Sequence, residues 1–173
     1  MTSLDLKKYV RDIPDFPKPG ILFRDITPLL ASAAAFQETI DRFAEHYRHE
    51  RVDSIVAAES RGFIFAAPLA LALQASFVPV RKPGKLPFAK HSHSYDLEYG
   101  SDTLEMHVDA MQSGQRVLVV DDLLATGGTV QACCKLLENF SVEIVGCAFC
   151  IHLTALEGAA RLRPHRVFSI LEY

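Results

Sequence analysis

The chain has 173 residues, of which 49% are hydrophobic and 23% charged, and its 18 Lys and Arg against 21 Asp and Glu give a formal net charge of −3. These averages exclude a disordered chain or a coiled coil, and the mild acidity argues against a general nucleic-acid binder. At about 100–200 residues per domain, the length predicts a single domain over residues 1–173. No apolar run approaches the roughly 20 residues of a membrane-spanning helix, so we expect a cytoplasmic protein without membrane or nucleic-acid partners.

The cysteine content does not change this class. The four cysteines are Cys133, Cys134, Cys147 and Cys150. The last two lie three residues apart in an apolar run, and if that run is a strand their side chains point to opposite faces and cannot bind one zinc ion. Free cysteines commonly act as small buried hydrophobic residues, so we expect four structural thiols.

The hydrophobic pattern alternates between strand and helix periods along the chain. In chain order it predicts a short helix over 4–10, an extended segment at 21–23, a helix over 36–47, a strand over 54–58, a helix over 63–75, a strand over 77–80, a hairpin over 95–99 and 103–108, a strand over 117–120, a helix over 129–139, a strand over 142–152, a helix near 156–162 and a final strand over 167–171. Alternating strands and helices predict an α/β fold with a mainly parallel sheet flanked by helices.

Residues 81–94 differ in composition from the rest of the chain. They contain four Lys and Arg and no acidic residue, so they carry +4 and leave −7 for the remaining residues. Two prolines and Gly84 interrupt any regular element in this stretch. The composition therefore predicts a mobile basic loop, suited to a ligand that carries several negative charges.

The most informative stretch is VLVVDDLLATGGT, residues 117–129. Its buried strand is predicted to deliver Asp121 and Asp122 to the carboxyl end of the sheet, where open α/β folds bind ligands. Residues 125–129 come directly before a predicted helix, and Gly127 and Gly128 allow backbone amides to wrap an anion at the helix start. This order of strand, acid pair, glycine loop and helix predicts a phosphate site beside two carboxylates.

Two common nucleotide motifs do not account for this loop. It lacks the Lys-Ser/Thr pair of a Walker loop, and it has no GxGxxG pattern. Two acids beside a phosphate site can accept hydrogen bonds from a sugar diol or lie near a phosphate-bound Mg²⁺. A phosphorylated ribose would use both the acids and the glycine loop.

Residues 117–129 resemble the signature of the type I phosphoribosyltransferases, which bind 5-phosphoribosyl-1-pyrophosphate (PRPP). Further resemblance to this family lies, in the family's own order, in residues 16–26, 60–63, 81–87 and 97–100. The resemblance implies the type I phosphoribosyltransferase fold, in which about residues 1–35 form a small hood over the base. It also implies a flexible loop and hairpin that close over the site.

The resemblance further implies roles for individual residues. The ribose and the 5-phosphate of PRPP would bind Asp121, Asp122, Ala125, Thr126, Gly127, Gly128 and Thr129. The pyrophosphate would contact Ser60, Arg61, Arg81, Lys82 and Lys85. Adenine would bind Ile21, Leu22, Phe23 and Arg24. The implied catalytic residues are Glu98, as the group that transfers the purine proton, and Tyr99, which helps to close the site.

The implied reaction belongs to purine salvage, in which adenine and PRPP give AMP and pyrophosphate. Mg²⁺ is the expected cofactor, carried mainly by PRPP with Asp121 and Asp122 nearby, and a homodimer is the expected assembly. Hypoxanthine, guanine or xanthine stays open as an alternative base. A non-catalytic regulator that senses PRPP is a further alternative, although only a short amino-terminal stretch is left for a DNA-binding module.

Overall fold

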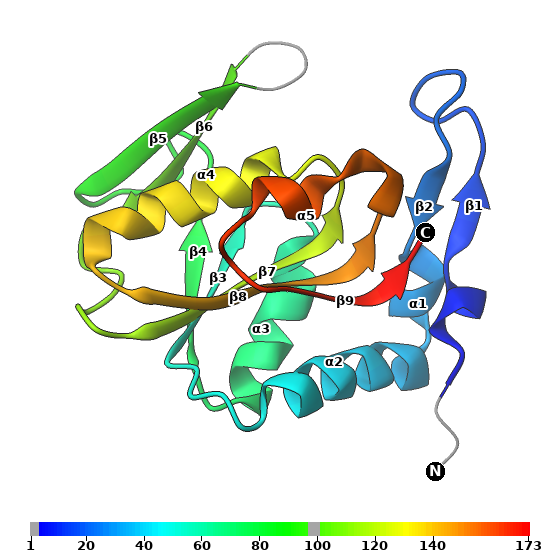
Figure 1. Ribbon diagram of the computed structural model, residues 1–173, viewed down its shortest axis with the longest axis horizontal. Coiled ribbons are helices and arrows are strands. Elements are labelled where there is room, and N and C mark those ends of the chain that lie inside the picture. Colours follow the sequence, from blue (N-terminus) through cyan, green and yellow to red (C-terminus); the bar gives the residue numbers. More distant parts are fainter. Residues whose placement is uncertain (1–3, 97–100) are drawn as a thin grey trace.

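The computed structural model describes residues 4–96 and 101–173 of the chain (Figure 1). The strands are β1 (Arg11–Ile13), β2 (Phe23–Asp25), β3 (Ser54–Ala58), β4 (Ser76–Val80), β5 (Lys90–Asp96), β6 (Ser101–His107), β7 (Arg116–Leu124), β8 (Glu143–His152) and β9 (Val167–Glu172). The α-helices are α1 (Thr27–Ala31), α2 (Ala33–Tyr47), α3 (Gly62–Ala72), α4 (Gly128–Leu137) and α5 (Gly158–Arg161). Short 3₁₀ helices span Leu6–Tyr9, Glu138–Phe140 and Thr154–Leu156.

The centre of the fold is a five-stranded sheet in the order β4-β3-β7-β8-β9, and its neighbouring strands run parallel. Parallel neighbours require long crossover connections, which α3 makes between β3 and β4 and α4 makes between β7 and β8. Figure 1 shows α2 and α3 on one side of the sheet and α4 on the other. The predicted α/β fold with a parallel sheet between helices is confirmed.

No helix in the described part of the chain is long and apolar enough to cross a membrane.

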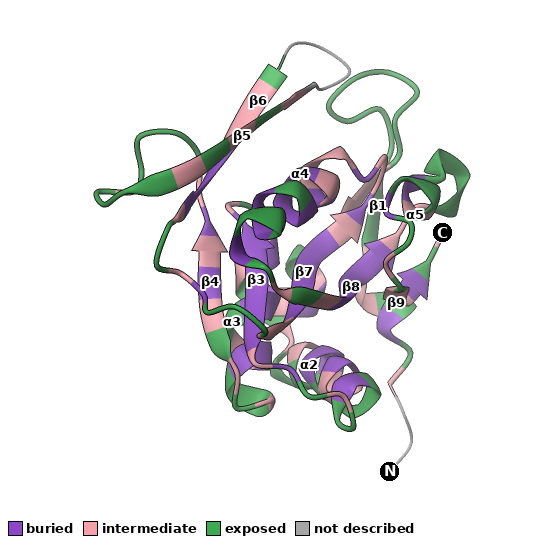
Figure 2. Ribbon diagram, turned by 60° about the vertical axis from the view of Figure 1, so that its left-hand side comes forward, coloured by how far each residue is buried: buried purple, intermediate pink, exposed green. Residues whose placement is uncertain are grey.

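Strand β7 is buried on both of its faces (Figure 2). Leu118 and Val120 pack into the cluster that α2 and α3 cover, whereas Val117 and Val119 pack into the cluster beneath α4. A strand that contacts an apolar layer on each side needs hydrophobic residues at consecutive positions. This explains the uninterrupted apolar run from which the strand was predicted.

The cysteines are structural, as predicted. All four thiols are free and buried. Cys147 belongs to the cluster under α4 and Cys150 to the cluster under α2 and α3, so the two side chains point to opposite faces of β8. They cannot share a metal ion.

Two small antiparallel sheets flank the central one. Strands β1 and β2 pair near the amino terminus, and β5 and β6 form a hairpin that packs against α4. Figure 1 shows these two sheets at opposite sides of the molecule. They correspond to the predicted hood and hairpin, and both precede β7 in the sequence.

Three predicted boundaries were wrong. The predicted helix over 4–10 is only a single 3₁₀ turn, Leu6–Tyr9. The predicted loop over 81–94 ends at residue 89, because Lys90–Asp96 pairs along its whole length with Ser101–His107. The polar side chains of that strand had hidden it, and two of them face a buried acidic partner on β6.

The third boundary is the end of β7. The strand was predicted to end at residue 120, yet it continues to Leu124. Asp121 and Leu123 continue the register with β8, opposite Phe149 and Ile151. The two aspartates therefore lie within the strand rather than beyond its end. Their carboxylates tolerate this position because Ser60 and Arg61, in the loop before α3, contact them.

Candidate functional site: a phosphate cradle beside two buried carboxylates

The loop between β7 and α4, residues 125–129, forms a hollow that we call the cradle. Residues 121 and 123–130 line this hollow, whose volume is about 100 Å³. Gly127 has φ +81°, and a Cβ atom at this position would lie 2.8 Å from the carbonyl oxygen of Gly158. Only glycine fits both the left-handed backbone and this close approach. The cradle thus opens onto the amino-terminal end of a ten-residue helix, where unpaired amides and the helix dipole favour an anion.

The two carboxylates next to the cradle are buried and hold different partners. Asp121 and Asp122 are 7% and 6% exposed. Asp121 Oδ1 accepts hydrogen bonds from Ser60 Oγ and from the Asp122 amide, each at 2.9 Å. Asp122 Oδ2 lies 2.8 Å from Arg61 Nε but accepts no hydrogen bond from the described residues. A buried oxygen without such a donor is suited to accept one from a ligand hydroxyl.

The protonation of the pair follows from its burial. Burial, together with the adjacent Asp122 charge, raises the pKa of Asp121 to about 7. Two neighbouring carboxylates in a site poor in water resist carrying two negative charges. Near neutral pH Asp121 is therefore partly protonated. A cation or a hydroxyl donor would favour its ionised form.

The loop before α3 is brought against these carboxylates by a glycine. A Cβ atom on Gly62 would lie 2.5 Å from Asp121 Oδ1 and 3.0 Å from Asp121 Cα, so no other residue fits without moving β7. Ser60 Oγ also accepts a hydrogen bond of 3.0 Å from the Gly62 amide, which orients the hydroxyl toward Asp121. Ser60 and Arg61, predicted from the sequence as pyrophosphate contacts, thus lie beside the predicted ribose contacts.

The predicted pyrophosphate cations on the basic segment, which we define as residues 81–90, are mostly paired with acids of the same chain. Arg81 Nε lies 3.0 Å from Glu59 Oε2, which also accepts the Lys82 amide at 3.0 Å. Lys82 Nζ lies 3.7 Å from Asp102 Oδ2. The hydrogen bonds from Arg81 and from the Lys82 amide keep the pKa of Glu59 below its usual value. Within the described residues, Lys85 has no ion pair of its own.

The hood contributes an aromatic ring to the same region. The Arg61 guanidinium carbon lies 5.3 Å from the centre of the Phe23 ring, and Phe16 packs edge-on against that ring at 5.1 Å. Ile21 and Leu22 are 44% and 45% exposed, a large exposure for apolar side chains. The predicted adenine segment therefore presents apolar surface next to the predicted pyrophosphate loop.

The side chain of Arg24 has partners different from those of the other three predicted adenine residues. Its guanidinium forms an ion pair with Asp12 and stacks 3.9 Å from the centre of the Tyr173 ring. Its side chain thus ties the hood to the carboxyl terminus, and its backbone pairs with Asp12 in the small sheet. The side chain of Arg24 has a structural role in the hood.

The predicted catalytic residues Glu98 and Tyr99 lie outside the residues that the structure describes. Their assignment stays a prediction that rests on the family resemblance. The described residues hold no group of three or more His, Cys, Asp or Glu side chains placed to bind a metal ion. The nearest oxygen donors for Mg²⁺ at the cradle are those of Asp121 and Asp122.

Three residues near the site were missed by reasoning from the sequence. Gly158 of α5 is required because a Cβ atom there would lie 2.1 Å from the Ala125 carbonyl oxygen. The Tyr95 hydroxyl lies 3.3 Å from Thr129 Oγ1 and so joins the hairpin to the cradle. Glu105 is buried in β6 under the basic segment. No sequence signal identifies these residues, because each acts on a partner more than 20 positions away.

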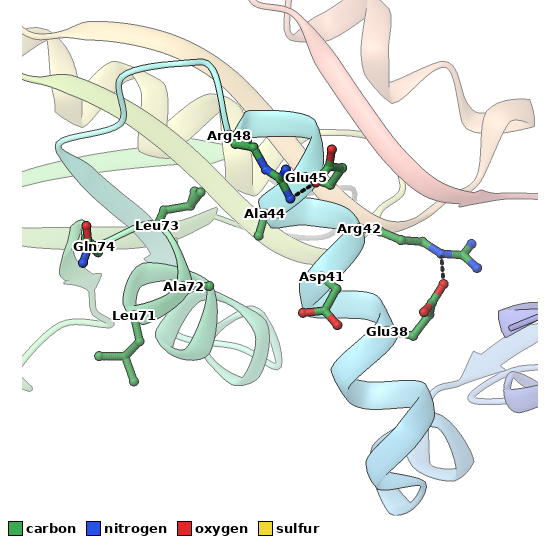
Figure 3. Close-up of a pocket in the computed structure, with 10 residues that line it drawn as sticks. All are labelled: Glu38, Asp41, Arg42, Ala44, Glu45, Arg48, Leu71, Ala72, Leu73 and Gln74. Carbon is green, nitrogen blue, oxygen red and sulfur yellow. Dashed lines mark hydrogen bonds and ion pairs between the residues drawn. The ribbon is translucent and has the colours of Figure 1, made fainter. Parts of the chain in front are cut away.

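A larger hollow lies elsewhere and contains no predicted site residue. It has a volume of about 660 Å³ and lies between α2 and the carboxyl end of α3 (Figure 3). Its charged side chains pair with one another, as Arg48 does with Glu45 and Arg42 with Glu38. Leu71, at its edge, is 82% exposed. Volume alone therefore does not identify the functional site of this chain.

Comparisons with known proteins identify the family of this chain. Residues 26–171 match the family model described as the phosphoribosyl transferase domain. An adenine phosphoribosyltransferase of Rhodopirellula baltica is 62% identical over 98% of this chain and 82% of its own length, and one of Acaryochloris marina is 56% identical over 98% and 100%.

Solved structures give the same result. An adenine phosphoribosyltransferase of Thermoanaerobacter pseudethanolicus is 48% identical, covers 99% of this chain and 100% of its own, and superposes with a TM-score of 0.95. That of Saccharomyces cerevisiae, bound to adenine and an imino-altritol bisphosphate, is 40% identical over 95% and 96%, with a TM-score of 0.90. This chain, with its cradle, its paired carboxylates and its hood, belongs to the adenine phosphoribosyltransferases of the type I phosphoribosyltransferase family.

Proposed function

We propose that this chain transfers the phosphoribosyl group of PRPP to adenine, giving AMP and pyrophosphate, in the cytoplasm. The observation that carries the proposal is the meeting of a phosphate cradle, two buried carboxylates and the Arg61 cation at the end of β7. In the reaction, adenine N9 bonds to the anomeric carbon while the bond from that carbon to pyrophosphate breaks. The bonding electron pair leaves with pyrophosphate, and Glu98 would receive the proton from N9.

The ribose and its 5-phosphate fit the cradle side of the site. The amides at the start of α4 and the hydroxyls of Thr126 and Thr129 would hold the 5-phosphate. Asp121 and Asp122 would accept hydrogen bonds from the 2- and 3-hydroxyls, and the unbonded Oδ2 of Asp122 is available for one of them. Binding both ends of the sugar phosphate fixes the anomeric carbon in place between the hood and the basic segment.

The pyrophosphate would replace internal ion pairs. Arg61, Arg81 and Lys82 each neutralise a carboxylate of the same chain, namely Asp122, Glu59 and Asp102. When the pyrophosphate binds Arg61, the ion pair between Arg61 and Asp122 breaks. Asp122 is then free to accept a hydrogen bond from the ribose diol. Cations positioned on the leaving group stabilise the charge that develops on it in the transition state.

Mg²⁺ fits this site as a partner of the substrate. The carboxylates of Asp121 and Asp122 are the hard oxygen donors that Mg²⁺ prefers, and the buried Asp122 Oδ2 has no hydrogen bond to lose. Mg²⁺ characteristically binds through substrate phosphates plus one or two carboxylates. When bound, it would neutralise the charge of the departing pyrophosphate. Meanwhile the protein's own residues hold the ribose and exclude water.

The chain is proposed to act as a homodimer through the outer face of α3. This helix is apolar at every position, GFIFAAPLALA, yet Ile64 and Leu71 are 39% and 82% exposed. With Ala67 and Pro68 they form a stripe at helical spacing, and a helix that is apolar all round is normally covered. A second copy would cover it in a self-complementary contact close to Ser60 and Arg61.

Light scattering after gel filtration tests the dimer. Leu71→Glu is expected to yield a monomer, whereas Leu156→Glu, at an exposed leucine outside α3, should leave the dimer intact. A wild-type chain that elutes as a monomer would remove this part of the proposal.

A base-selectivity assay tests the reaction. With PRPP and Mg²⁺, we expect AMP from adenine and little product from hypoxanthine, guanine or xanthine. If IMP or GMP forms while AMP does not, the assignment of the base is wrong. If none of the four bases reacts while PRPP still binds, the chain is a binding protein rather than an enzyme.

A further inference from the structure

The described chain contains a buried carboxylate that the proposed reaction does not use. Glu105 lies in β6 between Leu104 and Met106 and is only 6% exposed. Its two neighbours point into the apolar cluster beneath α4. Since successive side chains of a strand point to opposite faces, Glu105 points to the other face of the hairpin, where the basic segment covers it.

Glu105 makes contact with this segment at its beginning, its middle and its end. Its backbone exchanges two hydrogen bonds with Arg81, of 2.9 and 2.8 Å. Its Oε2 atom accepts the Gly84 amide at 3.2 Å and lies 2.8 Å from Lys90 Nζ. The Lys90 contact lowers the pKa of Glu105 and, together with the Gly84 amide, outweighs the opposing effect of burial, so the carboxylate is charged at neutral pH.

The Gly84 contact anchors a tight turn. The Lys85 amide donates a hydrogen bond of 3.3 Å to the Lys82 carbonyl, and Gly84 has φ +79° between them. A proline followed by a glycine with positive φ is typical of a type II turn. Because Glu105 holds the amide at the centre of this turn, it determines where Lys82 and Lys85 project.

Lys90 is used differently from the other cations. Its ammonium group forms an ion pair with a carboxylate that is 8% exposed, so little solvent competes for it. Lys85, by contrast, has no ion pair among the described residues, and the Lys82 pair with Asp102 is long and more exposed. Lys90 therefore stabilises the fold of the basic segment, whereas Lys82 and Lys85 are more accessible to a ligand.

We propose that Glu105 is a positioning residue that presets the basic segment for the pyrophosphate group, with Lys90 as its structural partner rather than a pyrophosphate ligand. The inference rests on the proposed function of Lys82 and Lys85 at that group. It adds a residue of β6, far from the cradle in sequence, to the determinants of pyrophosphate affinity.

The test measures binding of pyrophosphate and, separately, of AMP to the full chain by calorimetry. Glu105→Gln keeps the shape but removes the charge, and we expect roughly tenfold weaker pyrophosphate binding, in the range of a lost hydrogen bond to a charged group. AMP affinity should change less than twofold. Glu143→Gln, which removes an exposed partner of Arg116 at the opposite end of the sheet, is the matched control and should change neither affinity.

A double-mutant cycle distinguishes the two roles of Lys90. If Lys90 serves Glu105, the Glu105→Gln/Lys90→Met double variant binds pyrophosphate no more weakly than either single variant. If Lys90 contacts pyrophosphate itself, the losses add, and the proposal is overturned. The double variant leaves no unpaired buried charge, so this comparison with Lys90→Met remains possible if Glu105→Gln does not fold.

Further outcomes decide between this inference and the proposed function. Faster hydrogen exchange of the amides of residues 81–90 in Glu105→Gln, with exchange in β7 unchanged, is expected. Equal losses for AMP and pyrophosphate would overturn the positioning role. If Lys85→Met weakens pyrophosphate binding but Glu105→Gln does not, only this inference fails. If the wild-type chain does not bind pyrophosphate at all, the proposed function fails with it.

Discussion

At the scale of single residues, the site is defined by carboxylates whose environments differ. Asp121 is held by Ser60 and by a backbone amide, whereas Asp122 faces Arg61 and has an oxygen without a hydrogen bond. The two side chains are consecutive in the sequence, and each is held by its own neighbour in the loop before α3. In the proposed function both accept hydrogen bonds from the ribose diol, with the free Oδ2 of Asp122 as one acceptor.

Asp121→Asn tests the elevated pKa. Because the folded chain holds a proton on Asp121 up to about pH 7 whereas an unfolded aspartate loses it near pH 4, wild-type stability falls as the pH rises through this window. The variant lacks this loss. We expect its stability relative to wild type to increase by about 2 kcal/mol between pH 5 and pH 7, measured by urea unfolding.

The control for that experiment is Asp109→Asn, at an exposed carboxyl group after β6. Its stability relative to wild type should stay constant over the same pH range. A flat difference for Asp121→Asn as well would contradict the elevated pKa.

Glu98→Gln tests the proton-transfer role implied by the family resemblance. Removing a general acid–base group commonly lowers a rate by about 10²–10⁴-fold, so we expect kcat to fall at least about 100-fold. The affinity for PRPP should not change, because Glu98 would act on the purine. Glu172→Gln, at an exposed position of β9, is the control. An unchanged kcat in Glu98→Gln would remove that residue from the mechanism.

At the scale of elements, the site is assembled by close contacts between segments far apart in sequence. Helix α3 approaches β7 through Gly62, and α5 approaches the cradle through the Gly127 and Gly158 pair. The β5–β6 hairpin packs on α4 and reaches the cradle through Tyr95. Each contact fixes one wall of the site, and each depends on a small residue or a single polar group.

Tyr95→Phe tests the contact between the hairpin and the cradle. Since Tyr95 bonds to Thr129, whose hydroxyl would also bind the 5-phosphate, its loss should weaken PRPP binding and leave adenine binding intact. One neutral hydrogen bond contributes about 0.5–1.5 kcal/mol, so we expect the KM for PRPP to rise about twofold to tenfold.

The matched control lies one residue away. Ser94→Ala removes the hydroxyl that bonds to Thr103 within the same hairpin at 2.9 Å, without touching the cradle. If this variant raises the KM for PRPP as much as Tyr95→Phe does, the effect comes from loosening the hairpin rather than from Thr129.

At the scale of the whole molecule, the charges of the chain are sorted within a net −3. The basic segment and the loop before α3 pair with Glu59, which follows β3, and with carboxylates of β6 and β7, so the cations are neutralised within the chain. In the proposed function, a Mg²⁺-bound polyanion would replace these carboxylates as the partner of the cations. Binding would then connect the hood, the sheet edge and the hairpin.

PRPP should accordingly stabilise the entire fold, and only with Mg²⁺. At a concentration about 100 times its Kd, a ligand adds about 2.7 kcal/mol, which for a chain of this size raises Tm by about 5 to 10 °C. We expect EDTA to abolish most of this rise in a thermal-shift measurement. Ribose 5-phosphate, which lacks pyrophosphate, should give a smaller rise that EDTA does not alter. An equal rise with PRPP in EDTA would contradict the role of Mg²⁺.

Local sequence patterns predict the fold class and the glycine loop before α4. Both depend on short-range patterns: apolar residues buried on both faces of β7, helical spacing in α2, and two glycines between a strand and a helix. Such patterns follow from the backbone periods of strand and helix and need no distant partner. For the same reason the order of acid pair, glycine loop and helix predicts a site for a phosphorylated ribose.

Which charges are available to a ligand depends on how distant segments of the chain pack together. Composition alone makes residues 81–94 a mobile loop, yet Glu59 and Glu105 hold its cations and its turn, and its last residues form a strand. Likewise, Asp121 has its high pKa because folding buries it beside Asp122 and against Gly62. Burial and ion pairing depend on groups that are distant along the chain, and their energies depend on the solvent that packing removes. A local sequence pattern therefore cannot predict burial or ion pairing.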